Sequence, residues 1–313
     1  MSKLEELKTA LKNLVKEYTK LKSLKPEEKK AFGKKLNEQK NSLLKAIKLE
    51  EEKLETESLE PIDFSAPFSL NGDPLSFEKG TVHPLTKEIE LVTKIYSNMG
   101  FDVIEARQLD DEFHMFESLN FPEGHPARDG YDTFRTEEGF IPPAHTSTMQ
   151  YRALTRFKSN LDRGENIAVV IPGRVFRNED VDATHEHTFY QCEGVFVSKT
   201  ATLGELLGTW KNFFETYYGE KLNIKTQPGY FPFTEPSVEF LIEKPKSLGG
   251  GGWLEMGGCG MIHPNVLKTA GIDPTVYKGF AFGGGIDRLV MLKYGISDVR
   301  YFESGKLEFL TEF

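Results

Sequence analysis

Two strand-like runs joined by a short polar loop constrain the fold of this chain most strongly. Residues 168–176 and 188–197 are rich in apolar and β-branched side chains, whereas the segment between them is polar. The polar segment between the two runs is too short for the helix that usually connects parallel strands. The two runs therefore predict a long antiparallel hairpin. We therefore expect an α+β domain on an antiparallel sheet.

Other segments add to this domain. Helical patterns alternate with further short strand-like runs, which predicts that helices flank the sheet. The expected helices are 84–99, 202–219, 263–271 and 285–294, and the expected strands are 101–107, 237–243 and 253–259. Four successive glycines at 249–252 indicate a turn between strands and no chemistry.

The first 57 residues differ from the rest of the chain. Residues 1–49 hold 14 Lys, no Arg and 6 Glu, although the whole chain has a net charge of -9. Two apolar rows with steps of three and four are typical of a coiled coil, and Pro26 suits the start of a second helix with Ser23 as its cap. The rows are Leu4, Leu7, Leu11, Leu14, Tyr18, Leu21 and then Phe32, Leu36, Leu43, Ile47, Leu54.

We predict an antiparallel α-helical coiled-coil hairpin at 1–57, a linker at 58–80 and a main domain at 81–313. The lysine-rich faces suit either a nucleic acid or another protein, and charge alone does not decide between them.

Composition excludes several classes of protein. Cys192 and Cys259 are too few for a disulfide framework or a thiolate zinc site, so we expect them to pack in the core. No apolar run reaches the length that crosses a bilayer, and the first residues lack the apolar segment of a signal peptide. We therefore expect a cytoplasmic location and no association with a membrane.

Two arginines stand in unusual contexts. There is no phosphate-binding G-x-x-x-x-G-K-[ST] loop, and the glycines at 283–285 lack the third glycine of a dinucleotide fingerprint. Arg177, with Glu179, ends a strand-like run, where a guanidinium can hold a phosphate; the alternative is an internal ion pair. Arg288 follows the glycines at the start of a helix, where it suits a nucleotide or is simply a surface residue.

The order of these segments resembles the three motifs of class II aminoacyl-tRNA synthetases. Within that class the chain is similar to the α subunit of the bacterial heterotetrameric phenylalanyl-tRNA synthetase family, almost without a break over 81–313. The similar segments include His125-Pro126-Ala127-Arg128, Asp132-Thr133-Phe134, His145-Thr146-Ser147, Gly173–Glu179, Phe231–Ser237, Gly258–Leu267 and Gly279–Gly283.

This resemblance implies ATP-dependent activation of L-phenylalanine and its transfer to the 3′-terminal adenosine of tRNA(Phe). It assigns catalysis to Arg177, Glu179 and Arg288. Arg177 would contact the α-phosphate of ATP, and Arg288 would contact the γ-phosphate. ATP would also contact His185 and Phe189, and Mg²⁺ would bind Glu255. A metal site at His185 and His187 is not expected, because a third ligand is missing.

The resemblance also implies the amino-acid pocket. Phe231 and Phe233 would contact the substrate ring, with Ala281 below it, and Glu193 would attract the ammonium group. The same set of contacts includes His145, Ser147, Gln150, Gln191 and Gly283.

The family further implies a β subunit in an α2β2 heterotetramer. A non-catalytic synthetase-like scaffold and a ligase for another amino acid are the alternatives. Several residues depart from the family pattern, namely Pro142-Pro143-Ala144 before His145, Thr148 for proline, Tyr190 for histidine and Asp287 for glutamate.

Overall fold

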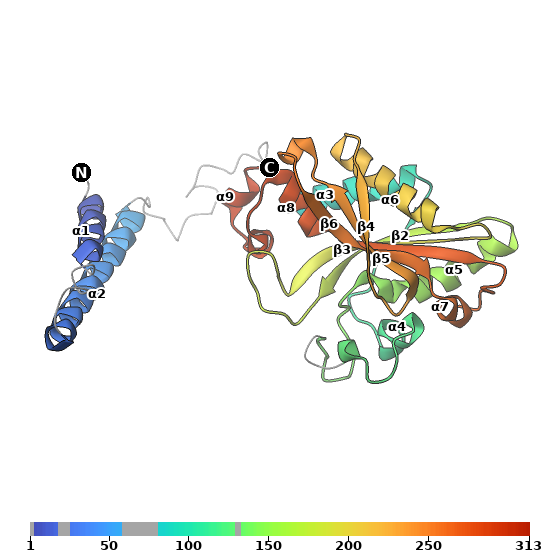
Figure 1. The fold of residues 1–313 in the computed structure, drawn as a ribbon, viewed down its shortest axis with the longest axis horizontal. Helices are drawn as coiled ribbons and strands as arrows, with labels where there is room; N and C mark the ends of the chain where they lie inside the picture. The colour runs from blue at the N-terminus through green and yellow to red at the C-terminus, as the bar shows by residue number, and fades with distance from the viewer. Residues whose placement is uncertain (1–2, 18–25, 58–80, 129–132) are drawn as a thin grey trace, which may run out of the picture. The chain divides into compact units, whose positions relative to one another are not determined.

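The structure is a computed structural model that describes residues 3–17, 26–57, 81–128 and 133–313 (Figure 1). The chain divides into two compact units, residues 1–78 and 79–313. Each unit is treated by itself below. The predicted linker at 58–80 lies outside the described residues.

The first unit contains the helices α1 (Lys3–Glu17) and α2 (Pro26–Glu57). The second helix begins at Pro26, as predicted, because proline lacks the N–H that a helix leaves unpaired in its first turn. The proposed cap, Ser23, and two members of the first apolar row, Tyr18 and Leu21, lie outside the described residues.

The two helices contact each other through both apolar and charged side chains. Leu36 and Ile47 are buried, whereas most lysines are exposed. Lys3 pairs with Glu50 at 3.1 Å, so the start of α1 lies beside the later part of α2. A helical pair is therefore present, and its coiled-coil geometry stays a prediction.

The second unit is built on a seven-stranded sheet in the order β1-β2-β3-β7-β6-β5-β4. The predicted hairpin is confirmed, with β2 (Ile167–Phe176) antiparallel to β3 (Thr188–Ser198) along the whole of β2. The other strands are β1 (Asp102–Val103), β4 (Ile224–Pro228), β5 (Thr234–Glu243), β6 (Trp253–Ile262) and β7 (Lys278–Gly285).

The expected antiparallel sheet is confirmed, with one parallel pair added at its edge. Strand β1 has only two residues and runs parallel to β2. The connection between them is long and includes the helices α4 (Glu112–Met115) and α5 (Gln150–Asp162), which allows the chain to return in the same direction.

Helices cover both faces of the sheet (Figure 1). On one face lie α3 (Pro84–Asn98), α6 (Leu203–Tyr218) and α8 (Ile286–Tyr294); on the other lie α5 and α7 (Pro264–Thr269). A short α9 (Leu307–Leu310) follows near the end of the chain. None of the described helices is both long enough and apolar enough to cross a membrane.

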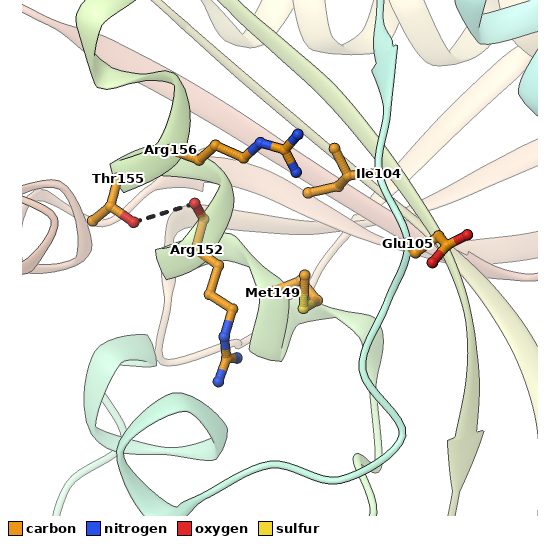
Figure 2. Close-up of a pocket in the computed structure, with 6 residues that line it drawn as sticks. All are labelled: Ile104, Glu105, Met149, Arg152, Thr155 and Arg156. Atoms are coloured by element: carbon orange, nitrogen blue, oxygen red, sulfur yellow. Dashed lines mark hydrogen bonds between the residues drawn. The ribbon is translucent and has the colours of Figure 1, made fainter.

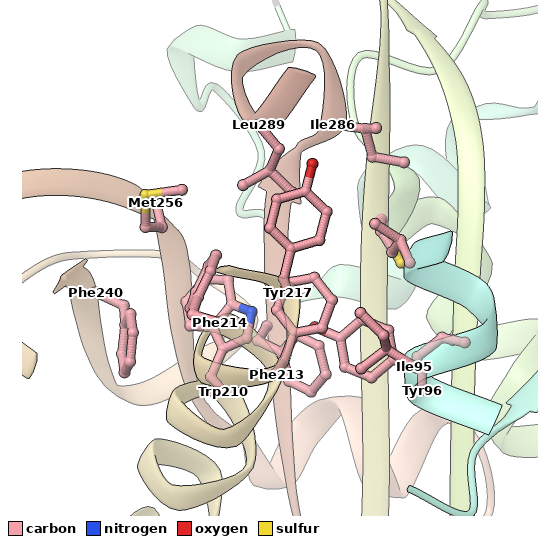
Figure 3. Packing of buried hydrophobic residues seen from close by; sticks show 14 of the residues in the cluster. Ile95, Tyr96, Trp210, Phe213, Phe214, Tyr217, Phe240, Met256, Ile286 and Leu289 are labelled. Atoms are coloured by element: carbon pink, nitrogen blue, oxygen red, sulfur yellow. The ribbon is translucent and has the colours of Figure 1, made fainter. Parts of the chain in front are cut away.

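The strands alternate between two apolar cores, as β geometry requires. On β7, Phe280 and Phe282 enter the core under α3, α6 and α8, whereas Ala281 enters the core beside α5. Figure 3 shows the first core, in which Tyr217 of α6 packs with residues of α3 and α8; Lys293, near the end of α8, lies 4.8 Å from the centre of the Tyr217 ring. Opposite Phe282, Gly194 is required because a β-carbon there would overlap the ring.

A buried carboxylate joins three helices of the first core. Glu88 of α3 is 2% exposed. It accepts hydrogen bonds from Tyr217 Oη at 2.6 Å, Lys293 Nζ at 2.7 Å and Tyr294 Oη at 2.8 Å. These contacts fix the C-terminal end of α8, the helix that carries Arg288 at its other end.

Candidate functional site

The predicted site residues gather around one cavity of about 970 Å³ in the second unit. The cavity lies against strands β3, β5, β6 and β7 and the start of α8. All but one of the predicted residues line it, the exception being Gln150. The lining includes His145, Ser147, Arg177, Glu179, His185, Phe189, Gln191, Glu193, Phe231, Phe233, Glu255, Ala281, Gly283 and Arg288.

Arg177 is held rigidly at the end of β2. Its backbone N–H donates to His187 O at 2.9 Å, and its side-chain Nε donates to Ala144 O at 3.0 Å. Its guanidinium carbon lies 5.0 Å from the centre of the Phe189 ring. The side chain therefore reaches the cavity in a fixed orientation, and its terminal nitrogens, which bond to no residue in the described part of the chain, can receive an anion.

Arg288 lies on the first turn of α8 and is exposed. Among the residues that the structure describes, it has no hydrogen-bond or ion-pair partner. Both arginines line the same cavity, although they are far apart in the sequence. Among the described residues neither arginine forms an ion pair within 4.0 Å, so Arg177 is not in the internal ion pair that was its alternative, whereas an exposed Arg288 still fits either interpretation.

A buried carboxylate lies on the cavity wall opposite Gly283. Glu193 is 3% exposed, and its two oxygens accept from Ser147 Oγ at 3.0 Å and Gln150 Nε2 at 2.6 Å. Burial raises the pKa of Glu193 to about 7, while the two hydrogen bonds act against this rise. Gln150 does not line the cavity itself, but it holds in place the carboxylate of Glu193, which does. A cationic group bound beside Glu193 would favour its ionised form.

His145 has an unpaired nitrogen. Its Nδ1 is buried without a hydrogen-bond partner among the described residues. Burial, with the charge of Arg177 as a second cause, lowers the pKa of His145 to about 3, so the ring is neutral. The ring lies parallel to Phe121, with centroids 6.3 Å apart, and contacts Phe233 at 6.1 Å. A neutral imidazole can offer a ligand one hydrogen bond without adding charge.

Two phenylalanines form an apolar wall. The rings of Phe231 and Phe233 are 5.9 Å apart and nearly parallel, at 28°. Both line the cavity, but the extended segment predicted around Pro232 is wrong: residues 232–233 form a turn, closed by a hydrogen bond from Thr234 N–H to Phe231 O at 3.1 Å. A β-carbon at Gly258 would overlap the Phe231 ring, and Gly260 pairs with Ala281 across the strands. Small residues therefore leave a slot bounded by aromatic rings.

The cavity also holds carboxylates that fit a divalent cation. Glu255 of β6 is exposed, and Glu239 of the adjacent β5 is half-buried. Both line the cavity, and neither has an ion-pair partner among the described residues. Oxygen ligands of this kind suit Mg²⁺.

Another group of possible metal ligands lies elsewhere, at Asp110, Asp111 and His114. Arg152 already donates two hydrogen bonds of 2.7 Å to Asp110. This group does not line the cavity, and we assign it no metal.

The residues that depart from the family pattern are accommodated locally. Tyr190 donates its backbone N–H to Asp287 Oδ2 at 2.6 Å, which attaches the start of α8 to β3. Burial raises the pKa of Asp287 to about 7. Arg174 donates to the hydroxyl of Tyr190 at 2.9 Å. The hydroxyl of Thr148, by contrast, is buried without a partner among the described residues.

Sequence reasoning missed some residues of the cavity. Phe121, Tyr230 and Glu239 line it but received no role. Phe121 and Glu239 carried no local signal that separates them from ordinary core or surface residues. Tyr230 directly precedes the Phe231 motif, and that position was the one available sign.

A smaller cavity of about 380 Å³ lies between α5 and the segment after β1. It is lined by Ile104, Glu105, Met149, Arg152, Thr155 and Arg156. In Figure 2 the guanidinium of Arg152 points away from Ile104, consistent with its contact to Asp110. No predicted site residue lines this cavity.

Comparison with known proteins gives the same family as the resemblance of the sequence motifs. Residues 62–313 match the family described as "tRNA synthetases class II core domain (F)". "Phenylalanine–tRNA ligase alpha subunit" from Geobacillus thermodenitrificans is 40% identical over 304 residues, covering 93% of this chain and 86% of the relative. The chain therefore belongs to the phenylalanine–tRNA ligase alpha subunit family of class II tRNA synthetases.

Other phenylalanine–tRNA ligase alpha subunits show a similar degree of identity. The protein from Enterococcus faecalis is 40% identical over 302 residues, which cover 94% of this chain and 85% of the relative. The protein from Yersinia pestis is 39% identical over 307 residues, which cover 96% of this chain and 89% of the relative. Residues 2–61 match "Aminoacyl tRNA synthetase class II, N-terminal domain", so family membership extends over both units.

Proposed function

We propose that this chain is the catalytic subunit that activates L-phenylalanine with ATP and transfers it to the 3′-terminal adenosine of tRNA(Phe). The observation that carries the proposal is one cavity that joins two distant arginines to an aromatic slot with a buried carboxylate. A scaffold has no need of this combination, and a slot lined by Phe231, Phe233 and Ala281 favours an apolar side chain.

The first step needs no general base. The carboxylate of phenylalanine is already an anion, and one of its oxygens attacks the α-phosphorus of ATP. The new O–P bond forms as the bond to pyrophosphate breaks, which gives phenylalanyl-adenylate. Catalysis then depends on position and on cations near the phosphate oxygens.

The two arginines suit different parts of the triphosphate. Arg177 is held by Ala144 and lies on the Phe189 ring, so it would contact the α-phosphate at the reacting centre. Arg288 is exposed and unpaired among the described residues, so it would reach the γ-phosphate. Glu179 and His185 complete the proposed ATP contacts.

The amino acid would bind with its ring between Phe231, Phe233 and Ala281. Its ammonium group would meet Glu193, which Ser147 and Gln150 hold in place. Binding of the cation would favour the ionised carboxylate and so lower its pKa. His145, Gln191 and Gly283 would form the remaining wall.

Mg²⁺ would be held by Glu255 and Glu239, and when bound it supplies positive charge to the phosphate oxygens. These carboxylates line the same cavity as the two arginines. The residues of this chain would then hold the triphosphate from two sides.

The second step transfers the aminoacyl group to the 2′-hydroxyl of the terminal adenosine and releases AMP. The chain would work with a β subunit in an α2β2 assembly, as the name alpha subunit of its relatives suggests. The lysine-rich helical pair would bind the phosphates of the tRNA backbone.

Phenylalanine-dependent pyrophosphate exchange tests the first step. The chain is purified together with its β subunit, and exchange is compared for Arg177→Ala, Arg288→Ala and the control Arg163→Ala. Arg163 is an exposed arginine outside the cavity that pairs with Glu165. We expect the first two variants to lose exchange and the control to retain it. Absence of exchange in the unaltered complex would support the scaffold instead.

Deletion of residues 1–55 tests the role of the helical pair. The deletion should weaken tRNA binding while exchange stays nearly intact, because the cavity lies wholly in the second unit. Loss of exchange would contradict this division of labour.

A further inference from the structure

An exposed aromatic side chain stands at the edge of the cavity. Tyr230 is 75% exposed, more than any other large apolar side chain among the described residues. It lines the cavity together with its neighbour Phe231. It makes no hydrogen bond or ring contact with any described residue. An aromatic ring that stays in water beside a substrate cavity is well placed to bind a planar ligand.

The loop that carries Tyr230 is held in place by hydrogen bonds. Gly229 N–H donates to Ser237 O at 3.1 Å, and Phe231 N–H donates to Ser237 Oγ at 3.2 Å. Asn120 Nδ2 donates to Pro232 O at 2.8 Å. The backbone on both sides of Tyr230 is therefore fixed, so its ring is presented at low entropic cost.

The position of Tyr230 separates it from Phe189, the aromatic residue among the proposed ATP contacts. Phe189 lies on β3, whereas Tyr230 precedes β5, which is three strands away in the order β3-β7-β6-β5. Adjacent strands are about 4.8 Å apart, so the two positions are separated by roughly 14 Å. One base cannot contact both rings.

The charges around Tyr230 select the part of a nucleotide that can bind there. Glu239 and Glu255 line the cavity on the same side, and Glu235 is exposed. The Mg²⁺ proposed above would offset this charge while the triphosphate is bound. In the transfer step, after pyrophosphate has left, the carboxylates repel phosphate, so contact through the RNA backbone is disfavoured. The face of a base carries no charge and stacks on aromatic rings regardless of its sequence.

We propose that Tyr230 is a stacking platform for a nucleobase of the single-stranded 3′ end of tRNA. This inference rests on the proposed function, because the 3′ end must reach the adenylate between the aromatic slot and Arg177. Tyr230 would act in transfer and not in adenylate formation.

The test compares Tyr230→Ala with Tyr230→Phe in the complete complex with the β subunit. Stacking of one base is worth roughly 1–3 kcal/mol, so kcat/KM for tRNA charging should fall about 5- to 150-fold in Tyr230→Ala relative to pyrophosphate exchange. Tyr230→Phe should restore charging, because it keeps the ring. A charging-to-exchange ratio that is unchanged in Tyr230→Ala would overturn the proposal.

A second measurement uses tRNA that lacks its 3′-terminal single-stranded nucleotides, as an inhibitor of charging. The unaltered and Tyr230→Ala complexes should bind this truncated tRNA equally, since the stacked base is absent. A remaining difference in the inhibition constant would place Tyr230 elsewhere on the tRNA. Loss of the β subunit from the Tyr230→Ala complex, seen by size-exclusion chromatography, would instead show a protein interface. Failure of exchange in the unaltered complex would refute the proposed function itself.

Discussion

The substitution Gly283→Ala tests how tightly the amino-acid pocket is built. Gly283 pairs with Glu193 across β7 and β3. A β-carbon at Gly283 would lie 2.7 Å from Glu193 Oε2, whereas ordinary contact begins at 3.4 Å. Glu193 would therefore have to move by roughly 0.7 Å, a shift of the size that overpacked sites in proteins require.

The carboxylate cannot make this shift freely. Its oxygens accept the hydrogen bonds from Gln150 at 2.6 Å and Ser147 at 3.0 Å, which the movement would lengthen. Overpacking of this kind costs about 1–3 kcal/mol, which corresponds to roughly 5- to 150-fold in affinity. Since Glu193 is proposed to bind the ammonium group, the KM for phenylalanine should rise by such a factor.

The assay is pyrophosphate exchange at varied phenylalanine concentration, with thermal unfolding measured in parallel. Gly285→Ala is the matched control, because it adds the same atom to the same strand but meets nothing within 4 Å. Its KM for phenylalanine should stay within about twofold of the unaltered value. An unchanged KM in Gly283→Ala, with normal thermal stability, would refute the packing argument.

Three further outcomes are expected. Ala281→Gly enlarges the slot and should admit para-substituted phenylalanines in exchange assays; unchanged selectivity would contradict the placement of Ala281. As pH falls through about 7, protonation of Glu193 should raise the KM for phenylalanine while stabilising the free protein, because the folded-state pKa is raised; Glu193→Gln should abolish the KM trend. Lys293→Met leaves Glu88 buried and without its cation, which should lower the free energy of unfolding by about 3–5 kcal/mol. Glu88→Leu should lower the free energy of unfolding by less, because the side chain of Lys293 is 31% exposed and can reach water. A lower melting temperature for Glu88→Leu than for Lys293→Met would show that this ion pair is not the source of stability.

Local sequence patterns located the elements that depend on short-range chemistry. The hairpin of β2 and β3 follows from β-branched residues on both sides of a polar loop, and the helices α3, α6 and α8 from their apolar periodicity. The start of α2 at Pro26 follows from the missing N–H of proline. These features need no distant partner, and the structure confirms them.

Other elements were not predictable, because packing decides them. Strand β7 includes Gly279 and Gly283–Gly285, which have low strand propensity, and it forms only because β3 and β6 pair with it on both sides. Strand β1 is parallel because of a long connection, and helix α5 buries only a narrow stripe that includes Ala153 and Leu154. A strand was expected at 101–107, but its direction has no local signal; α5 was missed although its few apolar residues, in a mostly polar segment, do fall on one face.

The sequence by itself determined the family, the order of the motifs and the residue types of the site, because these are properties of linear order. It also supplied the positions of Arg177 and Arg288, but left each as either a ligand contact or an ordinary surface or ion-pair residue. Tertiary structure decided that both line one cavity, that Glu193 is buried and that Tyr230 is exposed. Burial and convergence depend on strands far apart in the chain, so no local pattern can specify them.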